Sequence, residues 1–74
     1  MQGQNLQALI KQNMNMVKAI SKRYAGEGIE IDDLIQEGVI GIMQAAENYR
    51  PNFNVSFPSY AGKWILNRIK RAAA

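Results

Sequence analysis

The sequence predicts an all-α fold, a compact bundle of three main helices in a single domain spanning residues 1–74. Apolar residues recur at steps of three and four in three segments, which is the spacing of an amphipathic helix. Glycine and proline residues separate these segments. The chain contains no cysteine and no histidine, so disulfides and thiolate or imidazole metal sites cannot stabilise it. Helix packing, or a partner, must supply the stability of so small a domain.

The first helix is expected at about residues 5–25. Asn5 is a suitable N-cap because its side-chain oxygen can accept a hydrogen bond from a first-turn amide. Gly26 and Gly28 are expected to end the helix, since glycine readily adopts the positive φ of a helix C-cap. The apolar stripe of this helix consists of Leu6, Leu9, Ile10, Met14, Val17, Ile20 and Tyr24.

The second helix is expected at about residues 32–49. Asp32 or Asp33 can cap its start, and both carboxylates favour the positive end of the helix dipole. Gly38 and Gly41 lie inside the helix, and each costs about 1 kcal/mol relative to alanine. Two such costs predict a close helix–helix contact that compensates, and the alternative is a helix weakened or broken there. The apolar face consists of Leu34, Ile35, Ile42, Met43, Ala45 and Ala46.

The third helix is expected at about residues 58–73, after a loop at residues 49–58. The loop is rich in proline and asparagine, which form turns. Phe53, Val55 and Phe57 alternate within it, so a short extended piece is the alternative. Pro58 suits the first turn of the helix, where the missing N–H has no cost.

Charges are segregated along the chain, whose net charge is +3. Residues 1–26 carry four bases and no acid, and residues 27–47 carry all six acids and no base. Residues 48–74 carry Arg50, Lys63, Arg68, Lys70 and Arg71 and no acid. This segregation indicates two surfaces with different partners. The alternative is a set of solvated helix faces.

The residue types present predict no enzyme, no cofactor and no metal site. Serine and tyrosine lack a histidine to activate them, the acids lack the spacing of metal ligands, and no glycine-rich phosphate loop is present. No apolar run approaches the roughly 18 residues that span a bilayer. No signal pattern starts the chain. We therefore expect a cytoplasmic protein that makes no membrane contact, consistent with the absence of cysteine.

The C-terminal third has the composition of a nucleic-acid surface. Its cations can bind phosphates, and aromatic rings beside cations can stack on unpaired bases. Phe57 and Tyr49 are expected in the core. Tyr60 and Trp64 are four residues apart and share a helix face, which leaves both core packing and base stacking open for this pair.

Three motifs resemble bacterial sigma factors related to the primary, housekeeping type. Residues 33–38 (DLIQEG) and 40–45 (IGIMQA) are similar to the polymerase-binding segment of these factors. Residues 15–24 resemble the helix that precedes it. Downstream, residues 57–61 (FPSYA) and the pair Trp64–Ile65 resemble the segment that melts promoters and reads the −10 element. The resemblance extends from about residue 5 to residue 71 and identifies the second conserved region of a sigma factor.

The resemblance implies that the second helix binds core RNA polymerase at the clamp coiled coil of its largest subunit. That coiled coil is rich in arginine, and an acidic helix complements it. Val39 stands where many relatives have a polar residue. The positions that match the polymerase-binding residues are Asp33, Gln36, Glu37 and Met43.

The resemblance also implies capture of the melted non-template strand of the −10 element, with an adenine flipped from the stack. Tyr60 matches the aromatic that stacks on that base, and Trp64 matches the second of a tandem tryptophan pair. Asn67 stands where a glutamine often reads the upstream base pair, and an amide suits a purine edge. The residues expected to hold phosphates are Lys63, Arg68, Lys70 and Arg71.

The chain departs from the housekeeping pattern at three positions. Lys63 replaces the first tryptophan of the pair, Val55 stands near a missing aromatic, and Pro58 replaces a small hydroxyl residue. An alternative sigma factor is therefore expected. Because the sequence contains no helix-turn-helix for the −35 element, a split sigma subunit or an excised domain is expected as well. A separate chain or a missing domain would supply −35 recognition. Two other functions stay open: a helical protein-interaction module without DNA binding, and a non-specific single-strand binder.

Overall fold

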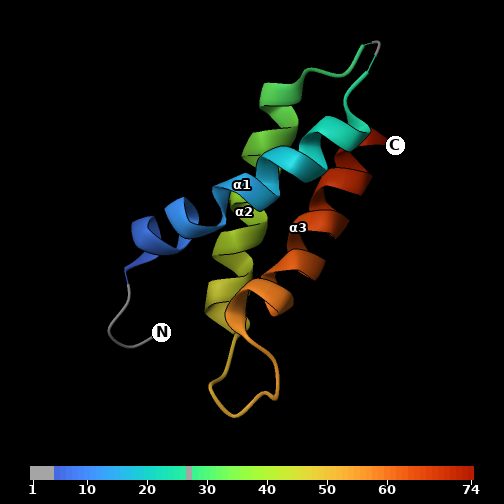
Figure 1. Cartoon of the computed structure of the whole chain (residues 1–74). Helices are drawn as coiled ribbons and strands as arrows, with labels where there is room; N and C mark the ends of the chain where they lie inside the picture. The colour runs from blue at the N-terminus through green and yellow to red at the C-terminus, as the bar shows by residue number, and fades with distance from the viewer. Residues whose placement is uncertain (1–4, 27) are drawn as a thin grey trace.

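The computed structural model describes residues 5–26 and 28–74. It contains three helices, α1 (Leu6–Tyr24), α2 (Ile31–Asn48) and α3 (Phe57–Ala73) (Figure 1). Apart from an isolated bridge between Gly26 and Ile29, the described ranges contain no β-structure. The all-α, three-helix prediction is confirmed. None of the described helices has the length and apolar character that a membrane crossing requires.

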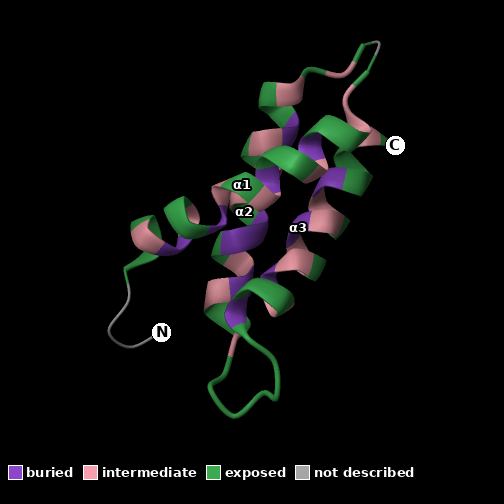
Figure 2. Ribbon diagram, in the orientation of Figure 1, coloured by how far each residue is buried: buried purple, intermediate pink, exposed green. Residues whose placement is uncertain are grey.

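α2 and α3 run antiparallel along one another, and α1 crosses both of them (Figure 1). The buried residues lie where the three helices face each other (Figure 2). They form one core that draws on all three helices, as expected for a small bundle. The core residues are Leu9, Val17, Leu34, Ile42, Ala45, Phe57, Ala61, Ile65 and Ile69.

The buried face of α1 is partly polar. Asn13 and Ser21 are buried in line with Leu9 and Val17 at four-residue spacing. The Asn13 side-chain amide donates to the Leu9 carbonyl at 2.8 Å, whereas the Ser21 hydroxyl has no hydrogen-bond partner among the described residues. Leu6, predicted in the apolar stripe, is exposed. The apolar pattern therefore identified Leu9 and Val17 and missed the two buried polar residues, Asn13 and Ser21.

Two of the three predicted caps need correction. Asn5 caps α1 as predicted, since its Oδ1 accepts from the Ala8 N–H at 2.7 Å. α1 ends at Ala25 in an extended conformation, so the predicted glycine C-cap is wrong; positive φ occurs only at Gly28 within the described ranges. The N-cap of α2 is Glu30, without a side-chain hydrogen bond, so capping by Asp32 or Asp33 is wrong as well.

The two glycines inside α2 allow close packing against both other helices. A Cβ atom on Gly38 would lie 2.7 Å from Val17 Cγ1. A Cβ atom on Gly41 would lie 3.0 Å from the Cα of Ile65. α2 is continuous through both positions, so the broken-helix alternative is wrong and the predicted close contact is confirmed.

The loop between α2 and α3 is held by local hydrogen bonds. The Tyr49 hydroxyl donates to the Val55 carbonyl at 2.7 Å, and the Phe53 N–H donates to the Arg50 carbonyl at 3.0 Å. Ser56 then caps α3, with Pro58 in the first turn as predicted. The loop contains turns and bends and no extended strand.

Candidate nucleic-acid and protein interfaces

One exposed face of α2 carries three of the four residues predicted to bind a protein partner. Asp33, Gln36 and Met43 are exposed and spaced so that they share this face with Ile40. Met43 is 41% exposed and Ile40 is 37% exposed. We call Asp33, Gln36, Ile40 and Met43 the α2 docking face. It combines a polar, acidic half with an apolar half, as protein interfaces do.

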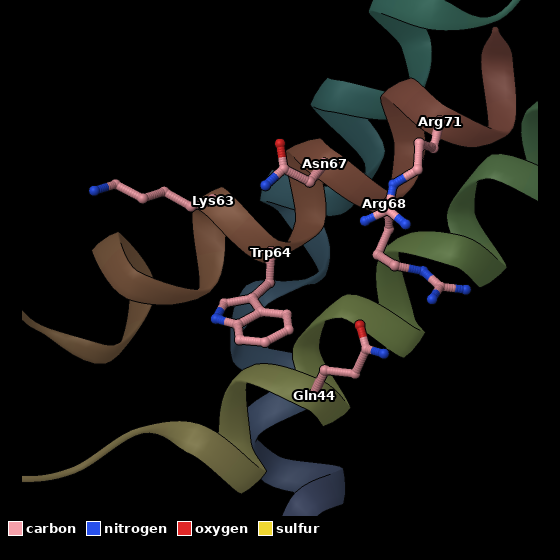
Figure 3. A pocket seen from close by; sticks show the side chains of 6 residues that line it. All are labelled: Gln44, Lys63, Trp64, Asn67, Arg68 and Arg71. Atoms are coloured by element: carbon pink, nitrogen blue, oxygen red, sulfur yellow. The ribbon is translucent and has the colours of Figure 1, made fainter.

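A groove between α2 and α3 collects most of the residues predicted to bind nucleic acid. In Figure 3, the Trp64 ring lies over α2 next to Gln44, while the Lys63 side chain extends away from it. Tyr60 and Lys70 do not line this groove. We call it the basic groove, and its lining residues are Gln44, Lys63, Trp64, Asn67, Arg68 and Arg71.

Gln44 was not among the predicted site residues, although the sequence holds a signal for it. It lies seven residues after Glu37, or about two helical turns, and therefore on the same edge of α2. That edge faces α3, because Glu37 contacts Arg68. The side-chain amide of Gln44 adds a neutral donor and acceptor to a groove otherwise dominated by cations.

An aromatic cluster continues the site beyond the groove and includes Tyr49, Phe53, Phe57, Tyr60 and Trp64. Phe57 is buried as predicted, and Tyr60 and Trp64 are half-buried. The ring centroids of Tyr60 and Trp64 are 6.2 Å apart. These two rings therefore pack against the core on one side and remain partly accessible on the other.

Phe53 is the residue of this cluster that sequence reasoning left without a role. Its ring centroid lies 5.5 Å from that of Tyr60 and 5.9 Å from that of Tyr49, yet 39% of the residue is exposed. A Phe in a loop of turn formers gives no periodic signal, so its position could not be read from spacing. It extends the accessible aromatic surface from Trp64 through Tyr60 into the loop.

An ion pair joins the two predicted surfaces. Arg68 donates from Nη2 and Nε to Oε1 of Glu37, at 2.6 Å and 3.1 Å. The side chains are 27% exposed for Arg68 and 34% exposed for Glu37. Ion pairs with this much solvent contact contribute about 0–1 kcal/mol to stability. No other ion pair occurs within the described ranges.

This pair changes the expectation for two predicted residues. Glu37 was assigned to a protein partner and Arg68 to a DNA phosphate, but in the free chain they bind each other. Glu37 thus lies at the edge of the α2 docking face and contacts the basic groove.

Across residues 5–26 and 28–74, no three acidic side chains gather as a metal site would require.

Comparison with known proteins agrees with the three motifs. Residues 9–74 match the family Sigma-70 region 2. The RNA polymerase sigma-C factor of Nostoc sp. strain PCC 7120 is 40% identical over 100% of this chain and 18% of its own length. The RNA polymerase sigma factor SigA of Lactococcus lactis subsp. cremoris is 41% identical over 92% of this chain and 19% of its own length.

SigA of Listeria monocytogenes serovar 1/2a is 44% identical over 89% of this chain and 18% of its own length. The chain thus spans about a fifth of the length of these curated relatives. The match includes the docking-face positions, the basic groove and the aromatic cluster, all of which lie within residues 9–74. On this evidence, the chain belongs to the Sigma-70 region 2 family.

Proposed function

We propose that this chain is the part of a sigma factor that binds core RNA polymerase and captures the single-stranded −10 element of a promoter. One observation carries the proposal: an exposed acidic and apolar face on α2 adjoins a basic, aromatic groove on α3. A factor that brings an enzyme to an opened DNA strand needs a protein-binding surface and a nucleic-acid-binding surface in the same molecule. The relatives named as RNA polymerase sigma factors support the same role.

The polymerase contact is proposed for the α2 docking face. Asp33 and Gln36 offer a carboxylate and an amide to an arginine-rich clamp coiled coil, with which they are electrostatically complementary. Ile40 and Met43 supply apolar area that the partner would cover, and a flexible methionine adapts well to such a surface. Glu37 lies beside them, at the edge of this face.

The DNA contact is proposed for the basic groove and the aromatic cluster. A base flipped from the stack needs a ring to stack on, and Tyr60 and Trp64 present partly exposed rings. Asn67 is exposed at the groove, where its amide can pair with a purine edge. Lys63, Lys70, Arg71 and, when it is released from its ion pair, Arg68 would hold phosphates.

The polymerase contact can be tested by introducing positive charge on the α2 docking face, outside the groove. The variants Asp33→Lys and Gln36→Lys should weaken capture of the chain by a fragment of the polymerase clamp by at least about tenfold. Gln7→Lys on α1 is the matched control, because Gln7 is exposed on a different helix. Undiminished capture of Asp33→Lys would refute polymerase docking through α2.

The DNA contact can be tested with a −10 non-template oligonucleotide. Tyr60→Ala and Trp64→Ala should each lower its affinity by about five- to a hundredfold, the worth of one stacked base. Tyr60→Phe keeps the stacking ring and should retain affinity. Clamp capture without oligonucleotide binding would indicate an interaction module alone. Oligonucleotide binding that ignores sequence, without clamp capture, would indicate a non-specific single-strand binder.

A further inference from the structure

We propose that the ion pair between Glu37 and Arg68 couples the two binding surfaces. When a cationic partner takes the Glu37 carboxylate, Arg68 becomes free to bind a DNA phosphate. In the free chain Arg68 is held by Glu37 and adds little to the affinity for a strand. The inference rests on the proposed function and adds to it a mechanism by which docking strengthens DNA capture.

The geometry leaves Glu37 open to a competitor. Both hydrogen bonds from Arg68 end on one carboxylate oxygen, Oε1, and no hydrogen bond within the described ranges reaches Oε2. An arginine from a partner can approach Oε2 first. The guanidinium of the partner's arginine prefers to pair with both oxygens of a carboxylate. The partner's arginine therefore competes with Arg68 for Oε1.

The position of the pair makes it accessible from both surfaces. Glu37 lines a hollow on α2 together with Asp33 and Gln36, whereas Arg68 lines the basic groove with Trp64 and Asn67. A third hollow between them is lined by both partners of the ion pair. Since both side chains are also partly exposed, the pair is weak enough to exchange partners.

The exchange changes the charge that a DNA strand meets. While paired, the Arg68 guanidinium is neutralised by the carboxylate and competes poorly for a phosphate. After release it adds one cation beside Trp64 and Asn67, and the salt dependence of single-strand binding should steepen by about 0.7 in log–log slope. Because binding free energies are reciprocal, DNA would strengthen partner docking by the same factor.

The test compares oligonucleotide affinity by fluorescence anisotropy with and without a saturating clamp fragment. Arg68→Ala should lower the affinity of the clamp-bound chain by up to about fivefold more than that of the free chain, since a partly exposed ion pair can withhold no more than that from the strand. Lys63→Ala is the matched control. Lys63 lines the same groove without an ion pair among the described residues, so its effect should be equal in both states.

A second measurement uses the free chain alone. Glu37→Gln removes the charge that holds Arg68 and should tighten oligonucleotide binding by about two- to fivefold. The same substitution in an Arg68→Ala background should have no effect. An equal gain in that background would show that Glu37 acts through net charge only, and would overturn the coupling.

The outcomes separate the coupling from the proposed function. If the clamp fragment does not bind, or if Tyr60→Ala leaves oligonucleotide binding unchanged, the proposed function fails. If both partners bind as proposed but Arg68→Ala and Lys63→Ala respond alike to the clamp, only the coupling fails.

Discussion

At Gly41 the backbones of α2 and α3 approach each other closely. A Cβ atom there would meet the Ile65 nitrogen at 3.1 Å and the Trp64 carbonyl oxygen at 3.1 Å. Both are backbone atoms, which cannot turn aside as a flexible side chain can. We expect Gly41→Ala to lower the free energy of unfolding by up to about 2 kcal/mol, because overpacking costs about 1–3 kcal/mol and the gain in helix propensity offsets only about 1 kcal/mol.

Urea unfolding followed by circular dichroism measures this difference. Gly26→Ala is the control, since a Cβ atom at Gly26 would have no neighbour within 4 Å and its φ is not positive. It should leave stability nearly unchanged. A Gly41→Ala variant as stable as the wild type would mean that α2 and α3 can separate at no cost.

Which residues share a face could be predicted from the sequence, but which residues pair across helices could not. The family resemblance singled out Asp33, Gln36 and Met43, and helical spacing places the three on one face. Apolar periodicity had assigned Met43 to the apolar face of the helix, but it is 41% exposed. The partner of Glu37 lies 31 positions away. Their pairing depends on the axial offset between α2 and α3. Residue spacing within one helix carries no information about that offset.

The loop before α3 is an element built from aromatic contacts. Tyr49 packs edge-on against Phe53 and Phe57, and its hydroxyl ties the end of the loop to its beginning. We expect Tyr49→Phe to keep the ring contacts and release this tie. The loss of stability should be small, about 0.5–1 kcal/mol, because water can reach the Val55 carbonyl.

Amide hydrogen exchange in residues 50–56 is the sharper readout, and Tyr49→Phe should accelerate it there while the rates in α1 stay constant. Tyr24→Phe serves as control, since within the described ranges the Tyr24 hydroxyl makes no hydrogen bond. Unchanged exchange in the loop would show that ring packing alone holds it.

At the scale of elements, the sequence pattern predicted three helices and their ends, but it predicted the capping residues less well. Observed boundaries differ from the expected ones by no more than one residue. Two of the three predicted caps were wrong, because Gly26 does not adopt a positive φ and α2 starts before Asp32. At the start of α2, Glu30 is the N-cap, and the two aspartates remain in the first turn, where the helix dipole favours them.

For the whole molecule, the acidic and basic segments that are separate along the chain lie next to each other in the folded structure. The acids of α2 and the bases of α3 lie on neighbouring helices and meet at a single ion pair. Segregation predicted two surfaces, and it could not predict that they share a border. The border follows from the antiparallel packing of α2 on α3, in which Gly38 and Gly41 allow close contact.

Oligonucleotide affinity of the whole chain should fall with salt. If Lys63, Lys70 and Arg71 each neutralise one phosphate, the logarithm of the binding constant should decrease with the logarithm of salt concentration at a slope of about −2. Titration of a −10 oligonucleotide at four or more salt concentrations measures it. If clamp capture buries apolar Ile40 and Met43 as proposed, it should depend on salt less steeply. A slope near zero for the oligonucleotide would contradict phosphate binding.

Trp64 is the one tryptophan of the chain, and its ring is half-buried between α2 and α3 next to Gln44 (Figure 3). Indole emission depends on the polarity around the ring. The unlabelled protein therefore carries an intrinsic spectroscopic reporter at the border of its two surfaces. A base stacked on the ring should quench its emission, so ligand occupancy can be followed without attaching a dye that would perturb so small a domain.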